Sequence, residues 1–445
     1  MTILQQLMLP FQAAFSKTNL GRERADWFVW ILLAIIVPFT SSISSNLLRS
    51  VQTLFGLELT QRRFYTFMAS PKLPWQQLWR ILWGVIPNPT TYGRLIVALD
   101  DFINPKIGRH VFGCATIFDH AAKANQSSYP WAQNIVTLGL LTFIKGRWAC
   151  LPLACRFYLP QSAINNKSNN MKRQGSIPTF KTKLAQAVEM LESVAKFFTK
   201  PIILVVTDSW FGNNGLFKPA RKAIGQRFHL LSRLRSNANL FGLPSQKKTG
   251  KRGRPLLYGE SLGSVSKMAA IVRKLATSFT VNTYGKSRTV LAYTQIVMLK
   301  TIKQQVRVVW VFRSTQWVAL FTTDLDLSVE QIIEIYAARW KIEAAFKELK
   351  QEIGSQRSQT RNAVAVSNHL QLCMMAMSVT WSYAALLQPD PKRRHIVKGR
   401  ASFAFSDVRY LLARAAMTED FNRLCPTSRI SASNPIIQAL MRLAA

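Results

Sequence analysis

The sequence predicts an α/β protein in which a central sheet is flanked by helices and interrupted by a β-rich insertion, with helical regions at both ends. Three observations predict this class. Apolar residues recur at helical spacing through about the first 90 residues. Short β-branched runs surround one helical stretch between about residues 91 and 208. A strong helix then begins at Ser328, and the rest of the chain is mostly helical in pattern.

The composition combines enough apolar residues for several cores with a large excess of positive charge. Of the 445 residues, 48% are hydrophobic and 18% are charged, with 58 Lys and Arg against 21 Asp and Glu. This composition excludes a disordered chain. The net charge of +37 favours a polyanionic partner, most often nucleic acid.

Other classes lack their sequence signals. The apolar run Trp27–Val37 stops at Pro38, and the polar residues within Leu370–Leu387 indicate a buried helix, so no membrane partner is expected. No secretory leader is recognisable, and the five cysteines contain no C-x-x-C pair, so neither a zinc site nor a disulfide framework is expected. Without a G-x-x-x-x-G-K-[ST] loop, no nucleotide cofactor is expected either.

The central elements follow from local hydrophobic patterns. Prolines at 71, 74, 87 and 89 punctuate the N-terminal helical region. The elements expected next, in chain order, are strands over Arg94–Leu99, Gly108–Phe118 and Asn134–Ile144, a helix over about Lys181–Phe198, and a strand over Ile202–Thr207 that is buried on both faces.

The β-rich insertion is expected over about residues 230–325 and is strongly basic. Residues 209–323 contain twenty Lys and Arg and a single acid, Glu260. Glycines and a proline interrupt the run Lys247–Pro255, which predicts a basic loop. Strands are expected over Thr289–Met298, Val306–Phe312 and Val318–Thr322. A capping box at Ser328 then opens a helix that should run to about Gly354.

Acidic residues beside apolar strands are the candidates for catalysis. Asp100 and Asp101 follow one predicted strand, Asp208 follows another, and Glu343 lies in the strong helix. Three converging carboxylates can hold Mg²⁺ or Mn²⁺, and two such ions can clamp the oxygens of a phosphodiester during its cleavage. A strand-end Asp often serves only as a cap, and Asp119 also ends a β-like run, so the first position stays open.

The strong helix presents an unusual polar face. At about 3.6 residues per turn, one face of this helix carries Tyr336, Arg339, Glu343 and Lys350. Arg and Lys beside a metal-binding Glu can bind the phosphates that flank a reacting one. The alternative is a solvated face with i,i+4 ion pairs, such as Glu343 with Lys347.

These residues resemble the Y-(2)-R-(3)-E-(6)-K signature of the DDE insertion-sequence transposases of bacteria. VVTDSWFGN, around Asp208, resembles the second-aspartate motif of that family, and ALDDFINPKIGRHVFG resembles the first. Phe102 stands where the family usually has Thr. The resemblance spans about residues 90–370 and implies an RNase H-like catalytic core.

The resemblance assigns roles to residues of this chain. It implies that Asp100, Asp208 and Glu343 form the catalytic, metal-binding triad, with Asp101 as the alternative first member. It also implies that Tyr336, Arg339 and Lys350 contact the transposon end. Trp210 could stack on an unpaired base near the cut. The basic loop is expected to bind DNA phosphates through Lys247, Lys248, Lys251, Arg252 and Arg254.

The expected function is cut-and-paste DNA transposition with two Mg²⁺ or Mn²⁺ ions. The expected partners are the terminal inverted repeats and target DNA, bound by a homodimer in the bacterial cytoplasm at the nucleoid. Residues 1–90 are a candidate for end binding, 91–360 for catalysis and 361–445 for dimerisation. The alternatives are another RNase H-like nuclease or resolvase, or a non-catalytic DNA-binding protein descended from a transposase.

Overall fold

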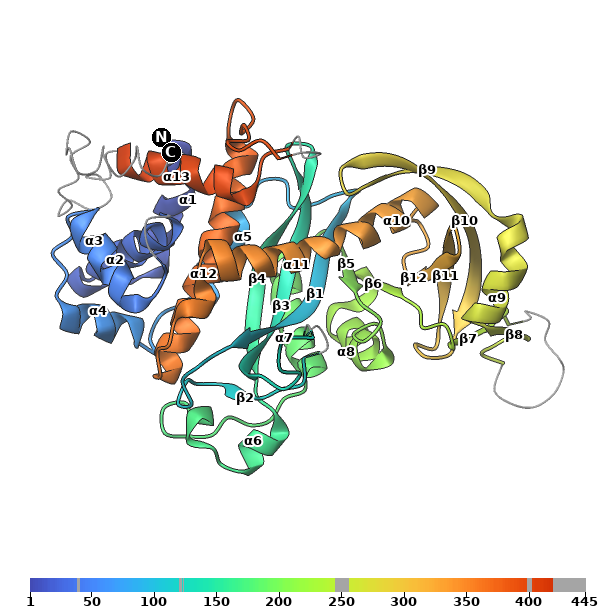
Figure 1. Ribbon diagram of the computed structural model, residues 1–445, viewed down its shortest axis with the longest axis horizontal. Helices are drawn as coiled ribbons and strands as arrows, with labels where there is room; N and C mark the ends of the chain where they lie inside the picture. Colours follow the sequence, from blue (N-terminus) through green and yellow to red (C-terminus); the bar gives the residue numbers. More distant parts are fainter. Residues whose placement is uncertain (38–40, 120–121, 123, 245–255, 398–401, 419–445) are drawn as a thin grey trace.

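A computed structural model describes residues 1–37, 41–119, 122, 124–244, 256–397 and 402–418. Helices surround one large mixed sheet (Figure 1). The described helices are α1 (Ile3–Met8), α2 (Asn19–Ile36), α3 (Ser44–Thr53), α4 (Gln61–Met68), α5 (Trp75–Val85), α6 (Gln161–Asn165), α7 (Lys183–Phe197), α8 (Asn214–Ile224), α9 (Val265–Val272), α10 (Val329–Ala338), α11 (Trp340–Lys347), α12 (Ala363–Leu386) and α13 (Phe405–Thr418).

The strands run in the order β2-β3-β1-β5-β6-β12-β11-β10-β7-β8, with β4 paired to β3 and β9 to β10. Their bounds are β1 (Arg94–Pro105), β2 (Cys114–Thr116), β3 (Trp131–Ile144), β4 (Arg147–Tyr158), β5 (Ile202–Thr207), β6 (Phe228–Arg233), β7 (Asn239–Phe241), β8 (Ser261–Ser264), β9 (Thr277–Thr283), β10 (Lys286–Leu299), β11 (Gln304–Arg313) and β12 (Gln316–Thr322).

The centre of the sheet combines parallel and antiparallel pairing. β1 is parallel to β5, and β5 is parallel to β6, whereas β1 and β3 are antiparallel. Helices α11 and α12 cover one face and α7 the other (Figure 1). The α/β class and the RNase H-like arrangement expected from the sequence are confirmed.

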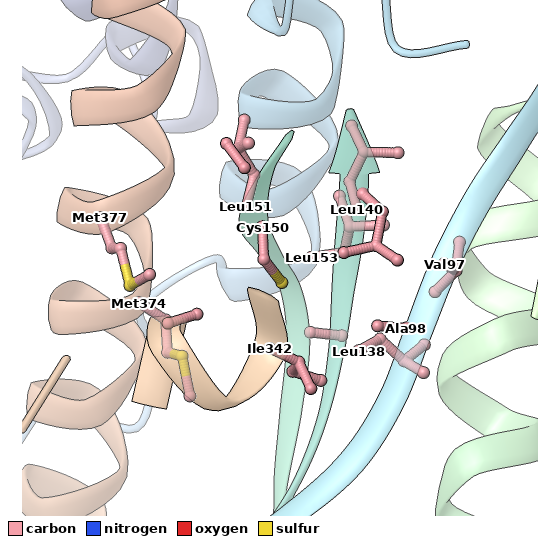
Figure 2. Close-up of a cluster of buried hydrophobic side chains, with 14 of the residues drawn as sticks. Val97, Ala98, Leu138, Leu140, Cys150, Leu151, Leu153, Ile342, Met374 and Met377 are labelled. Carbon is pink, nitrogen blue, oxygen red and sulfur yellow. The ribbon is translucent and has the colours of Figure 1, made fainter. Parts of the chain in front are cut away.

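Apolar packing fixes α11 and α12 against the sheet. Ile342 of α11 and Met374 and Met377 of α12 point toward β3 and β4, where they meet Thr137 and Cys150 (Figure 2). All five side chains are buried. Burying a side chain of this size stabilises the fold by about 1.5–3 kcal/mol. This packing determines which face of α11 turns toward β1.

The structure corrects three expectations. Most of Gly108–Phe118 is irregular, and only Cys114–Thr116 pairs in the sheet as β2. A strand that the sequence reading missed, β4, forms a long hairpin with β3 because Lys145 and Gly146 both adopt positive φ at the turn. β1 extends past Leu99 to Pro105, so Asp100 and Asp101 lie within this strand and do not end it.

The strong helix is also less regular than its pattern predicts. Ser328 does form the expected capping box with Gln331. α10 then ends at Ala338, α11 begins at Trp340, and the turn Glu348–Glu352 is a π-helix. Gly354 adopts left-handed φ of 79°, as expected for a helix terminator. A π-turn within a helix is frequent at functional positions.

The predicted insertion strands are present as β10, β11 and β12. They form an antiparallel series, and β12 pairs with β6, so these strands continue the central sheet. At the other end of the molecule (Figure 1), the N-terminal helices pack on α12 through two indole hydrogen bonds. Trp75 Nε1 donates to Asn368, and Trp79 Nε1 donates to Gln371.

Helix α12 contains the apolar stretch considered above as a membrane segment. Nearly all of its side chains are buried against the N-terminal helices, α13 and β4. Among the described residues, no helix has the length and hydropathy needed to cross a bilayer.

Replacing Glu348 with Gln should stabilise the protein at high pH. Burial raises the pKa of this carboxyl to about 7, although Arg147 lowers it, and the Trp381 indole donates to Glu348 Oε2 at 3.3 Å. Because the folded-state pKa lies above that of the unfolded chain, stability falls as pH rises from about 4.5 to 7. Gln keeps an acceptor for Trp381 and should raise the unfolding free energy at pH 8 by roughly 1–3 kcal/mol.

Urea unfolding between pH 4.5 and 8.5 would measure this effect. The exposed neighbour Glu352 provides the matched control: it raises the pKa of Glu348 less than burial does, so Glu352→Gln should change the pH profile much less than Glu348→Gln. Equal pH dependence in Glu348→Gln and the wild type would contradict the prediction.

Candidate active site

Two aspartates lie side by side on the central parallel strands. Leu99 of β1 pairs in register with Thr207 of β5, so Asp100 and Asp208 each follow one residue later on the same face. Asp208 is held at the strand end because its Oδ1 accepts the backbone N–H groups of Trp210 and Phe211, both at 3.0 Å. The other oxygen of Asp208 takes no part in those hydrogen bonds.

The pleat of β1 separates Asp100 from Asp101. Asp100 faces α11, where its Oδ2 lies 3.1 Å from Arg339 Nη1. Asp101 faces α7, where its Oδ2 pairs with Lys183 Nζ at 2.8 Å and accepts from Asn134 at 2.7 Å. Of these two alternatives for the first acid, Asp100 is therefore the one placed on the same face as Asp208.

Arg339 connects the sheet to Glu343. Its Nη2 lies 3.3 Å from Glu343 Oε1, one helical turn away, while Nη1 contacts Asp100. The Arg339 side chain is 8% exposed and that of Glu343 is 39% exposed. One guanidinium thus bridges a strand carboxylate and a helix carboxylate, in place of the Glu343–Lys347 surface pair considered from the sequence.

Burial and mutual repulsion alter the acidity of this cluster. Burial raises the pKa of Asp100 to about 7; Arg339 lowers it, and the neighbouring Asp208 raises it. Burial also raises the pKa of Glu343, with Arg339 opposing and Asp208 reinforcing the shift. Asp208 is therefore close enough to both other acids to act on them electrostatically, and the three form one cluster around Arg339.

The donor set suits a hard divalent cation. Carboxylate oxygens are the ligands that Mg²⁺ and Mn²⁺ prefer, and Asp100, Asp208 and Glu343 are the residues that could supply them. Within the described part of the chain, no three His, Cys, Asp or Glu side chains are already gathered closely enough to coordinate one ion. The Arg339 guanidinium provides the positive charge between Asp100 and Glu343 in this arrangement.

Lys350 lies at the far end of the polar face. Its Nζ donates to the carbonyl of Ile103 at 2.7 Å and sits 5.1 Å from the centre of the Phe102 ring. Phe102, at the position usually occupied by Thr, also packs on Phe346 with ring centroids 4.5 Å apart. Burial lowers the pKa of Lys350, and the negative charge of Asp119, the third candidate acid, opposes that shift. Lys350 thereby ties the π-helical turn after α11 to β1.

The two aromatic candidates have different cationic neighbours. The Tyr336 ring centroid lies 5.8 Å from the Arg339 guanidinium carbon. Trp210 is 47% exposed, and its ring centroid lies 5.5 Å from the ammonium of Lys183. The basic-loop residues lie outside the described residues: Lys247, Lys248, Lys251, Arg252 and Arg254.

The sequence reading missed Arg233. Thr207 of β5 pairs with Ser232 of β6, so Arg233 follows one residue later, next to Asp208. Burial raises the pKa of Tyr336, and the positive charges of Arg339 and Arg233 oppose that shift, so Arg233 also acts on this phenol. The run Phe228–Arg233 has the β-type pattern that could have identified this strand, but its parallel register with β5 is a tertiary property.

Comparison with known protein families identifies the family of this chain. The family model of the DDE superfamily endonucleases matches residues 17–295, which include Asp100, Asp208 and Arg233 and stop before Glu343. No curated protein matches the sequence. Because the match spans more than half of the chain and includes the paired strand aspartates, the protein belongs to the DDE superfamily endonucleases.

Proposed function

We propose that the protein is a DNA transposase that cuts the ends of its own element and joins them to target DNA. The observation that carries this proposal is the meeting of Asp100, Asp208 and Glu343 around Arg339, on one face of the sheet. The net charge of +37 favours DNA as the partner.

Asp100, Asp208 and Glu343 would hold two divalent cations. When bound, such a pair lowers the pKa of an attacking water and stabilises the leaving oxygen of the phosphodiester. The chain itself positions the reacting phosphate and neutralises its charge. Tyr336, Arg339 and Lys350 extend along one side of the carboxylates and would bind the transposon strand, while the basic insertion would bind flanking phosphates.

The proposed complex is a homodimer on two inverted repeats. We assign end recognition to residues 1–90 and dimerisation to residues 361–445, with catalysis between them. Deletion of residues 1–90 is unsuitable as a test, because α5 and α2 pack directly on α12 and their loss would expose its apolar surface.

An assay with linear DNA carrying the element's two ends tests the proposal. We expect end cleavage and joining to a plasmid in Mg²⁺, and neither reaction in EDTA. Cleavage without joining would indicate a hydrolytic RNase H-like nuclease or resolvase instead. Binding without cleavage would indicate a transposase-derived DNA-binding protein.

Binding of the end duplex should weaken steeply with salt. If about six to ten phosphates are contacted, the affinity should fall by about 10³–10⁵-fold between 50 and 200 mM NaCl. Fluorescence anisotropy with a labelled duplex would measure this dependence. A nearly flat response would contradict the assignment of the basic insertion as a DNA surface.

A further inference from the structure

An acid-free cavity lies beside the carboxylate cluster. It has a volume of about 270 Å³ and is bordered by the end of β6, the β11–β12 hairpin and the junction of α10 with α11. Arginines and aromatic residues dominate its lining, which includes Arg233, Arg313, Arg339, Trp317, Tyr336 and Trp340. No Asp or Glu is among the lining residues. The cavity therefore favours an anion.

Two of its arginines are available for such an anion. Arg233 and Arg313 are both exposed, and neither forms an ion pair with a carboxylate of the described residues. Guanidinium groups bind phosphate oxygens through paired, charge-assisted hydrogen bonds. The chemistry of the lining thus matches a phosphate of a DNA strand, with the aromatic rings beside it available to contact sugar and base.

Arg339 belongs to both the cavity and the carboxylate cluster. Its terminal nitrogens contact Asp100 and Glu343, while its Nε is buried and makes no hydrogen bond to any described residue. The guanidinium carbon lies 5.3 Å from the Trp340 ring centroid, on the cavity lining. Arg339 is also the residue at which α10 gives way to α11. The Arg339 side chain therefore lies between the carboxylates of Asp100 and Glu343 and a cavity in which a ligand would supply the anion.

We propose that the cavity binds a phosphate of the DNA strand, and that Arg339 leaves Asp100 and Glu343 to join Arg233 and Arg313 on that phosphate. The proposal deepens the proposed function and rests on it for the identity of the substrate. Without DNA, Arg339 neutralises the carboxylates and competes with divalent cations for them. With DNA, the released carboxylates are free to bind cations, so DNA binding and cation binding become positively coupled.

The coupling can be measured through Mn²⁺ binding, followed by electron paramagnetic resonance. The DNA is a duplex of about 20 base pairs of arbitrary sequence, since a phosphate contact needs no specific end. For the wild type, we expect the duplex to tighten Mn²⁺ binding about tenfold, after correction for Mn²⁺ held by the duplex alone. Arg339→Ala should bind Mn²⁺ about tenfold more tightly than the wild type without DNA and gain little from the duplex.

Two further variants identify the sites involved. Arg313→Ala, which removes an exposed arginine of the cavity that the sheet register does not place beside Asp208, should keep wild-type Mn²⁺ affinity without DNA and lose most of the enhancement by the duplex. Adding Asp208→Asn to Arg339→Ala should abolish the tight binding and so place the ion at the carboxylates. Arg339→Lys, which can reach one carboxylate, should bind Mn²⁺ with intermediate affinity and guards against misfolding of the alanine variant.

Two results would overturn the proposed exchange of Arg339 between the carboxylates and the phosphate. One is an unchanged Mn²⁺ affinity of folded Arg339→Ala and Arg339→Lys in the absence of DNA. The other is an equal enhancement by the duplex in the wild type and in Arg339→Ala. Neither result requires transposition activity. If end cleavage fails in the assay above, the Mn²⁺-binding test can still support or overturn the exchange of Arg339.

Discussion

The Asp208→Asn variant should cleave element ends at least about 10³-fold more slowly than the wild type, a loss of about 4 kcal/mol in transition-state stabilisation. Asn is nearly isosteric, and its Oδ1 can still accept the N–H groups of Trp210 and Phe211. The local fold should therefore persist while the negative charge beside Asp100 is removed. Affinity for the end duplex should stay within about twofold of the wild type, because binding depends chiefly on the basic surface.

The matched control for this prediction lies on the opposite face of the same sheet. Asp101→Asn removes a carboxylate that pairs with Lys183 and does not face Arg339, so cleavage should fall by no more than about threefold. Asp100→Asn and Glu343→Gln should reproduce the defect of Asp208→Asn. Single-turnover cleavage and anisotropy provide the two measurements. Wild-type cleavage by Asp208→Asn, or a greater loss in Asp101→Asn than in Asp100→Asn, would refute the triad.

Arg339→Ala is expected to produce the largest pH-dependent loss of stability. Asp100 is largely buried, and the substitution leaves it without its cationic partner. Losing one partner of a buried pair costs about 3–5 kcal/mol. Because Glu343 is 39% exposed, water compensates part of the loss. We therefore expect a decrease of about 2–3 kcal/mol in the unfolding free energy at pH 8.5.

The sign of the pH dependence follows from Asp100. Its folded-state pKa is already raised to about 7 in the presence of Arg339 and should rise further without it. Stability is then lost as pH rises, because the folded state must give up a proton that the unfolded chain has already released. The cost of the substitution should therefore be greatest above pH 7 and shrink toward pH 5, where Asp100 is protonated in both folded proteins.

Urea unfolding of the wild type and Arg339→Ala at pH 5, 7 and 8.5 would measure this trend. Mg²⁺ should restore more stability to the variant than to the wild type, since the ion would replace the missing positive charge. Arg313→Ala is the control, because Arg313 is exposed and forms no ion pair with a carboxylate among the described residues. A pH-independent loss would mean that Arg339 contributes through packing alone.

Local sequence patterns were sufficient to predict several parts of this protein. Helical periodicity predicted α10 and its Ser328 cap, and an apolar run predicted β5 with Asp208 after it, because capping and burial are properties of neighbouring residues. The spacing of Tyr336, Arg339 and Glu343 correctly placed them along one helix face, although the helix breaks at Arg339. The basic excess and its concentration in the insertion are likewise properties of composition.

Other features were decided by tertiary structure alone. Asp100 and Asp101 are adjacent and chemically identical, and only the covering of the two sheet faces by α11 and α7 gives them different partners. Arg233 approaches Asp208 because β5 and β6 pair in parallel, which no local pattern in either strand encodes. The bridge from Arg339 to Asp100 depends on α11 packing on β4 and on β1, which lies more than two hundred residues away in sequence. The sequence by itself determined which chemical groups the protein carries. Long-range strand pairing and helix packing decided which of these groups meet, because such contacts join segments that are far apart in the sequence and that no local pattern connects.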